Sequence, residues 1–211
     1  MPRNCLVINV DRCIGCYSCE IACKMENDIN LGERWNKLLQ VEPFGDYPDV
    51  YTYWISFQCQ QCENAPCVHV CPTGASYRDA DTDMVLVDKE KCIGCRYCMM
   101  ACPYGVRCWN EEQRVVEKCT LCNHLTSAGE KPACVKNCCG TARFYGDMDD
   151  PDSDVSQELA KYDDECIHHL PDVGNTPLTC YILSPKFGEW RADDLTQTTS
   201  KYVITEGSVS Y

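Results

Sequence analysis

The sequence predicts an α+β protein, rich in loops and small antiparallel hairpins, that folds around metal centres and carries a C-terminal extension. Cysteine supplies 21 of the 211 residues, and sixteen of these cysteines fall in four groups of four. Two of the groups have matching sequences, so the chain contains an internal repeat. Only four Phe and four Trp are present. The apolar core must therefore be small, and bound metal is expected to stabilise the fold in its place.

The third cysteine group has the spacing of a cubane iron–sulfur site. Its sequence is Cys92-Ile-Gly-Cys95-Arg-Tyr-Cys98-Met-Met-Ala-Cys102-Pro103, which reads C-x2-C-x2-C-x3-C-P as in bacterial ferredoxins. In that motif three cysteines bind one cluster and the fourth binds a neighbouring cluster. We expect Gly94 to let the backbone pass close to the cluster, where a side chain would clash. One such group predicts a pair of clusters.

The first group repeats this pattern. A predicted strand at residues 6–11 precedes it, just as a predicted strand at 84–88 precedes the third group. Lys24 stands where the third group has Pro103, but the cysteine spacing is the same. The members of the first group are Cys13, Cys16, Cys19 and Cys23. We therefore expect two ferredoxin-like units.

The other two groups vary this spacing. In the second group the middle gap is longer, and residues 76–88 are expected to form a hairpin that leads to the third group. In the fourth group a gap of 11 residues must form a loop, and the spacing favours Cys138 over Cys139 as the last member. The second group is Cys59, Cys62, Cys67 and Cys71, and the fourth is Cys119, Cys122, Cys134 and Cys138.

The remaining segments carry weaker signals. Residues 24–58 form an insertion with a predicted strand at 50–57, and Trp35, Leu38, Leu39 and Val41 are expected to pack over the first group. Residues 155–162 predict a short helix capped by Ser153 or Asp154, and residues 179–183 predict a strand. The last twenty residues are expected to form an arm on a partner surface. The cysteines outside the groups are expected to be buried free thiols: Cys5, Cys108, Cys139, Cys166 and Cys180.

Composition excludes several classes of function. A net charge of −13 argues against nucleic-acid binding, which needs basic patches. Tight C-x2-C pairs rarely suit disulfide geometry, and structural zinc usually takes two such pairs or adds histidine. The N-terminal residues contain no signal peptide, and no window approaches the roughly 20 apolar residues of a membrane helix. We therefore expect any membrane contact to go through a partner.

Four further motifs point to a known family. They are Cys-Pro-Thr-Gly-Ala at 71–75, Glu-Lys-Cys-Thr-Leu-Cys at 117–122, the G-D-x-x-D-P-x-S-x-V run at 146–155 and Gly-Asn-Thr-Pro-Leu-Thr-Cys-Tyr-Ile-Leu at 174–183. With the four cysteine groups, they resemble the iron–sulfur subunit of molybdopterin oxidoreductases. This is the electron-transfer subunit of dimethyl sulfoxide, polysulfide, thiosulfate and respiratory arsenate reductases. The resemblance covers roughly residues 5–184.

The resemblance implies two interleaved ferredoxin-like domains. Residues 1–58 would hold the first half of domain A with the insertion, and residues 113–148 its second half. Residues 59–112 would form domain B, and residues 149–211 a C-terminal docking extension. It also implies four [4Fe–4S] clusters, one in each of four ligand sets: Cys13, Cys16, Cys19 and Cys138; Cys23, Cys119, Cys122 and Cys134; Cys59, Cys62, Cys67 and Cys102; and Cys71, Cys92, Cys95 and Cys98.

The function expected from this resemblance is electron transfer without catalysis. The sequence contains no nucleophile–base pair and no Gly-rich phosphate loop. The partners would be a molybdenum or tungsten pterin subunit and a membrane anchor, a quinone-linked subunit or a cytochrome. We expect assembly in the cytoplasm and export together with the catalytic partner, with a cytoplasmic location as the alternative. A free-standing soluble polyferredoxin that shuttles electrons between enzymes is the alternative function. The sequence names neither the substrate nor the direction of electron flow.

Four cations adjoin the predicted ligands, namely Lys24, Lys91, Arg96 and Lys118. They would either raise the potentials of individual clusters or be solvated surface charges.

Overall fold

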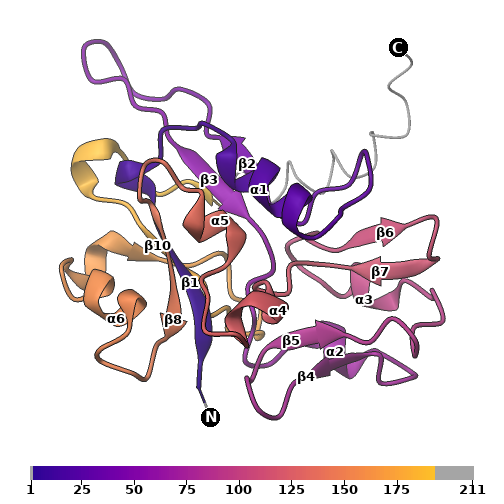
Figure 1. Ribbon diagram of the computed structural model, residues 1–211. Helices are drawn as coiled ribbons and strands as arrows, with labels where there is room; N and C mark the ends of the chain where they lie inside the picture. Colours follow the sequence, from indigo (N-terminus) through magenta and orange to yellow (C-terminus); the bar gives the residue numbers. More distant parts are fainter. Residues whose placement is uncertain (1, 193–211) are drawn as a thin grey trace, which may run out of the picture.

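The structure is a computed structural model that describes residues 2–192. The arm predicted for the last twenty residues lies outside the described part of the chain beyond Ala192. Short strands and helices alternate with long loops, as expected for a loop-rich α+β protein (Figure 1).

A four-stranded sheet joins the two ends of the described chain. Strand β1 (Asn4–Asn9) runs antiparallel to β8 (Arg143–Asp147) and parallel to β10 (Cys180–Ile182), which also pairs with β9 (Ile167–His168). Residues 5–9 of β1 are all buried. One face of β1 packs with helix α6 (Asp154–Leu159), and the other packs against β3 (Trp54–Phe57). The strand is therefore apolar on both faces, as its sequence predicts.

Three antiparallel hairpins complete the strand pairing. They are β2 (Lys37–Gln40) with β3, β4 (Ser76–Arg78) with β5 (Val85–Val87), and β6 (Cys108–Asn110) with β7 (Val115–Glu117). Figure 1 shows the β4–β5 and β6–β7 hairpins on one side of the molecule and the four-stranded sheet on the other. The predicted hairpin at 76–88 is confirmed, whereas the strand predicted at 50–57 begins only at Trp54.

These pairings connect the cysteine groups in a closed order. Each hairpin joins a strand that follows one group to the strand that precedes the next: β2 to β3, β4 to β5, and β6 to β7. The β1–β8 pair joins the strand after the fourth group to the strand before the first. Ile8 thus lies opposite Arg143, and the two ends of the cysteine sequence are brought together.

The helices are short and mostly lie beside cysteines. Helix α1 (Ser18–Glu26) carries Cys19 and Cys23, while four others span a single turn: α2 (Pro66–His69), α3 (Tyr97–Met100), α4 (Asn123–Thr126) and α5 (Ala133–Lys136). Helix α6 is capped by Ser153, whose side chain accepts the N–H of Ser156 at 3.2 Å. No helix in the described part of the chain has the length and apolar character needed to cross a bilayer.

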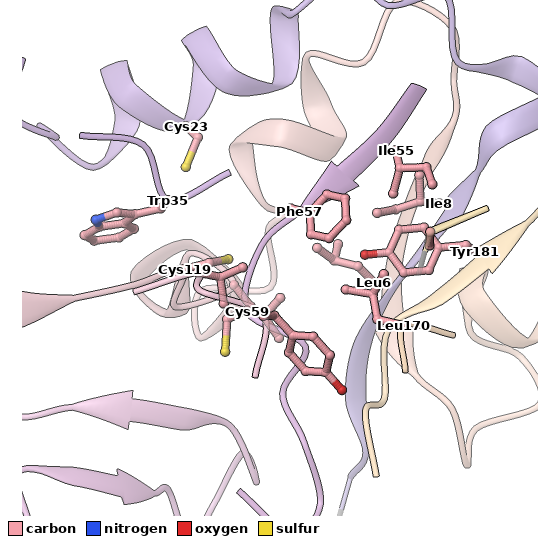
Figure 2. Close-up of a cluster of buried hydrophobic side chains, with 14 of the residues drawn as sticks. Leu6, Ile8, Cys23, Trp35, Ile55, Phe57, Cys59, Cys119, Leu170 and Tyr181 are labelled. Carbon is pink, nitrogen blue, oxygen red and sulfur yellow. The ribbon is translucent and has the colours of Figure 1, made fainter. Parts of the chain in front are cut away.

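The main apolar core merges with the cysteines. Figure 2 shows Leu6 and Ile8 of β1 packed beside Ile55 and Phe57 of β3 and Tyr181 of β10. The same cluster also includes Cys108, and it continues through Trp35 to three cysteines of the four groups, which are Cys23, Cys59 and Cys119. Loss of whatever these thiols bind is therefore expected to disturb the core directly.

Tyr181 provides a test of how firmly the C-terminal strand stabilises this core. Its buried hydroxyl donates to the Ser56 carbonyl at 2.8 Å and accepts from Gln60 Nε2 at 3.0 Å. Tyr181→Phe leaves that carbonyl without its donor, which is expected to lower the free energy of unfolding by about 1–3 kcal/mol. The measurement is anaerobic chemical denaturation. Tyr47→Phe is the matched control, because Tyr47 is 93% exposed. Equal midpoints for the two variants would contradict this account.

Candidate functional site

The loops of the first and third groups share a backbone feature next to a tryptophan. Gly15 and Gly94 have φ values of 66° and 69°, which favour glycine. A Cβ on Gly94 would lie 2.9 Å from both Trp109 Cη2 and the Arg114 carbonyl, and one on Gly15 would clash with the Trp54 indole. The tryptophan packed on each loop is thus a reason for glycine that the sequence analysis did not foresee.

The first set of thiols combines the first group with one cysteine of the fourth. Together they line one cavity, with Leu38 and Arg143 also in its wall. The backbone N–H of Ala142 donates to Cys138 Sγ at 3.2 Å. The set is Cys13, Cys16, Cys19 and Cys138. The β1–β8 pair brings these distant residues together.

The second set combines one cysteine of the first group with three of the fourth. Cys23, on α1, lies with three cysteines of the fourth group around a second cavity. Trp35 of the insertion and Arg143 also line this cavity, so Arg143 borders both the first and the second set. The set is Cys23, Cys119, Cys122 and Cys134.

The third set joins Cys102 to three members of the second group. Burial, together with the nearby thiols of Cys59, Cys102 and Cys67, raises the pKa of Cys62 to about 12. These four thiols therefore lie within electrostatic reach of one another. Asn175 Nδ2 donates to Cys62 Sγ at 3.1 Å and opposes the shift.

The fourth set brings Cys71 to the third group. Cys71, Cys92, Cys95 and Cys98 line another cavity. The backbone N–H of Ser76 donates to Cys71 Sγ at 3.3 Å. In the fourth set and in the first set alike, a backbone N–H thus donates to the one cysteine that comes from a different group, Cys71 or Cys138.

This arrangement suits polynuclear metal clusters. Four thiolates around a single zinc ion would each lie about 2.3 Å from the metal and leave no cavity between them. Within residues 2–192, no three His, Cys, Asp or Glu side chains lie as close together as the ligands of one ion. Four thiols instead surround each of three separate cavities, and this donor set suits a group of several metal and sulfide atoms.

Cluster binding must also remove protons from these thiols. Burial raises the pKa of Cys119 to about 12, and the neighbouring thiols of Cys134 and Cys59 add to the shift. The metal-free thiol is therefore neutral at physiological pH, and the metal must displace its proton. The effect of Cys59 on Cys119 also indicates that the second and third sets are neighbours, and Figure 2 shows these two residues side by side.

Comparison with known proteins decides the family. Residues 50–148 match a family described as a 4Fe-4S dicluster domain. The chain is 45% identical over 206 residues to a putative dimethyl sulfoxide reductase iron-sulfur subunit of Halobacterium salinarum, covering 84% of this chain and 78% of the relative. It is 36% identical over 240 residues to one subunit of the sulfite dehydrogenase of Allochromatium vinosum, covering 98% and 99%. It is 34% identical over 227 residues to an arsenate respiratory reductase iron-sulfur subunit of a Shewanella species, covering 85% and 95%.

The chain belongs to the family of iron–sulfur subunits of molybdopterin oxidoreductases. This confirms the resemblance seen in the sequence motifs. The matched segment contains the second, third and fourth cysteine groups entire. As a member of this family the chain is an electron-transfer subunit, and its centres are of the 4Fe–4S type.

Three polar residues of this iron–sulfur subunit lie close to the thiols, although they were not among the predicted site residues. Asn175 donates to Cys62, and Arg107 and Arg143 are buried beside several cysteines. Asn175 gave no sequence signal beyond its place in the family motif. The two arginines did give a sequence signal, because each is the fifth residue after the last cysteine of its group, Cys102 or Cys138.

The four cations that adjoin the groups differ in exposure. Lys91 is a surface residue paired with Asp88 at 2.8 Å, and the Arg96 guanidinium stacks 3.9 Å from the Trp109 ring centre. Lys118 is buried, and its ammonium donates to the carbonyls of Val85 and Cys119. The partly buried Lys24 donates to two carbonyls of the loop at 30–33.

The cysteines outside the four sets follow the prediction except at one position. Cys5, Cys108, Cys166 and Cys180 are buried free thiols. Cys139 is exposed, which corrects the expectation of burial, and its Sγ lies 3.2 Å from Cys16 Sγ. Cys138 lines the cavity of the first set and Cys139 does not, although Cys139 contacts Cys16 at the outer side of that set.

Exposed apolar side chains gather at the first and fourth sets. Ile14, Ile21 and Met25 are 63%, 60% and 80% exposed in and after the first group. Ile93 and Met100 are 67% and 83% exposed at the matching positions of the third group. Apolar side chains in such places are typical of surfaces that a partner covers.

Paired substitutions test the choice between two adjacent cysteines. Cys138→Ser is expected to lower the iron content by up to about four atoms per chain, because it removes one thiolate of the first set. Cys139→Ser is expected to leave the iron content unchanged. Iron and acid-labile sulfide are measured on anaerobically purified protein. A loss confined to the Cys139 variant would show that Cys139 is the ligand.

Proposed function

We propose that the chain is a non-catalytic subunit carrying four [4Fe–4S] clusters, one in each set of four cysteines, along a single path for electrons. The observation that carries the proposal is the order of the sets. Arg143 borders the first and second, Cys119 interacts with Cys59 between the second and third, and Arg107 interacts with Cys67 and Cys98 between the third and fourth.

The protein side of this function is to hold, insulate and tune the centres. Each bound cluster supplies a site that accepts and releases an electron. The thiolates hold the clusters, and backbone N–H groups at Cys71 and Cys138 stabilise negative charge on sulfur. Asn175 does the same at Cys62, with its other hydrogen bond to the Tyr104 hydroxyl at 2.7 Å fixing the amide. Each such donor favours the reduced cluster, which carries more negative charge.

The two ends of this path are the proposed partner surfaces. The exposed apolar residues at the first and fourth sets support docking of one redox partner at each end. One partner is a catalytic subunit with a molybdenum or tungsten pterin, in line with the reductase subunits named among the relatives. The other is a membrane anchor, a quinone-linked subunit or a cytochrome. The chain would be assembled in the cytoplasm and exported with its catalytic partner.

The interleaved domains follow from the same ligand sets. The first and second sets would define domain A from residues 1–58 and 113–148, and the third and fourth sets domain B from residues 59–112. The β1–β8 pair, which brings the ends of domain A together, supports this division. Residues 149–211 would add the docking extension.

Affinity purification of the tagged chain tests the function. Anaerobic purification from fractionated cells is expected to yield about sixteen iron atoms per chain. We expect one catalytic subunit and stoichiometric molybdenum or tungsten to accompany the chain in the extracytoplasmic fraction. Deletion of that subunit should leave the chain in the cytoplasm. A chain that purifies alone with full iron from cells making the partner would instead be a free polyferredoxin.

Serine variants test the crossed ligand sets. Cys102→Ser and Cys62→Ser are expected to remove the same electron paramagnetic resonance signal, because both residues belong to the third set. Cys92→Ser should remove a different signal. Cys108→Ser is the matched control, since this buried thiol donates to the Arg34 carbonyl at 3.1 Å and lies in none of the sets. If Cys102→Ser removes the signal lost in Cys92→Ser, the crossed assignment is wrong.

A further inference from the structure

Arg143 and Arg107 are buried cations at equivalent positions of the two proposed domains. Each is the fifth residue after the last cysteine of its group, and each is only 5% exposed. In each case the guanidinium is anchored by a buried serine. Arg143 Nη1 donates to Ser56 Oγ at 2.7 Å, and Arg107 Nη2 donates to Ser76 Oγ at 2.8 Å. The serine fixes one end of each guanidinium and leaves the remaining N–H groups for another acceptor.

Those remaining N–H groups face the thiols and lack an oxygen or nitrogen acceptor among the described residues. Arg143 Nε and Nη2 and Arg107 Nη1 are buried without a hydrogen bond within that part of the chain. A buried cation and buried donors are both costly unless an anionic acceptor compensates them. Arg143 lines the cavities of the first and the second sets, so its free donors lie where those two sets meet.

Each arginine lies beside two of the sets. Arg143 lines the cavity of the first set together with Cys19 and that of the second set together with Cys134. Arg107 is anchored by Ser76, which lines the cavity of the fourth set and whose backbone N–H donates to Cys71 Sγ. The thiols of Cys67 and Cys98, from the third and the fourth set, both lie within electrostatic reach of the Arg107 guanidinium.

We propose that Arg143 and Arg107 are shared tuning residues, each of which raises the reduction potentials of both clusters in its own domain. The proposal rests on the cluster assignment given above. A 4Fe–4S cluster with four thiolate ligands is an anion, and reduction adds a further negative charge. A fixed cation in a medium of low dielectric constant stabilises the reduced state more than the oxidised state. Because each arginine stands between two clusters, its removal affects a pair of potentials and spares the other pair.

Exposed cations near the clusters are expected to act differently. The side chain of Lys91 adjoins Cys92 but is 64% exposed and paired with Asp88. Solvent and salt screen such a charge, so it contributes little to the potential. Lys91→Gln is therefore the matched control for loss of a cation close to a ligand.

Potentiometric titration followed by electron paramagnetic resonance tests the proposal on the intact, cluster-loaded protein. In Arg143→Met, the ratio of reduced to oxidised cluster at a fixed potential is expected to fall at least tenfold for the first and second sets. This corresponds to about 59 mV for a one-electron couple. Arg107→Met should shift only the third and fourth sets. Lys91→Gln and the charge-conserving Arg143→Lys should stay within about threefold of the parent. Signals are assigned from those lost in Cys13→Ser, Cys122→Ser, Cys62→Ser and Cys92→Ser.

Two results would overturn the proposal. The first is unchanged potentials in either methionine variant with full iron. The second is a tenfold shift in Arg143→Lys, which would assign the effect to packing. If Arg143→Met fails to load iron, the lysine variant and Arg107→Met decide by the same criteria. Failure of the cluster assignment itself would be separate, since the parent protein would then lack about sixteen iron atoms.

Discussion

Every set of four thiols contains three cysteines of one group and one cysteine of another group. The pairing of the short strands brings that fourth cysteine to the other three. Cys138 reaches the first group because β8, which follows it, pairs with β1, which leads into Cys13. Cys71 reaches the third group because β4 pairs with β5 in the same way. The β2–β3 and β6–β7 hairpins perform the complementary task, since they join the segments that carry the second and third sets. Short strands are sufficient here, because they fix the positions of thiols and do not have to enclose a large apolar core.

Cysteine spacing predicted the grouping and the repeat, because ligand geometry constrains spacing locally. Apolar patterns predicted the strands before the first three groups, but β2, β6, β7 and β8 were not predicted. Cysteine spacing could not predict that Arg143 and Arg107 are buried, because an arginine is usually solvated and its burial depends on what surrounds it in the fold. The glycine at position 94 was predicted correctly as a required residue, but the tryptophan packed on it comes from β6 and is invisible to local spacing. Spacing predicted which of two adjacent cysteines lines the cavity, Cys138, but not that Cys139 would be exposed and in contact with Cys16.

The segment after the fourth group contributes to the interior as well as to the surface. Asn175 reaches Cys62 from a loop that Asp172 orders by accepting the N–H groups of Gly174, Asn175 and Thr176. That loop is held in place by the N–H of Glu63, which donates to the Thr176 carbonyl at 2.9 Å. The environment of a thiol in the middle of the chain thus depends on residues more than a hundred positions later. A truncation before residue 170 would remove this donor and the strand beside β1 together.

The central position of β1 has a consequence for how the protein is made. Both of its neighbours are synthesised long after it, since Val7 pairs with Phe144 and with Cys180. Translation at roughly 5–20 residues per second leaves β1 without partners for many seconds, during which its apolar faces and unpaired edges are open to aggregation. Cys13, Cys16 and Cys19 wait for Cys138 over the same interval. The first cysteine group and the strand before it can therefore reach their final surroundings only after nearly the whole of the described chain has been made.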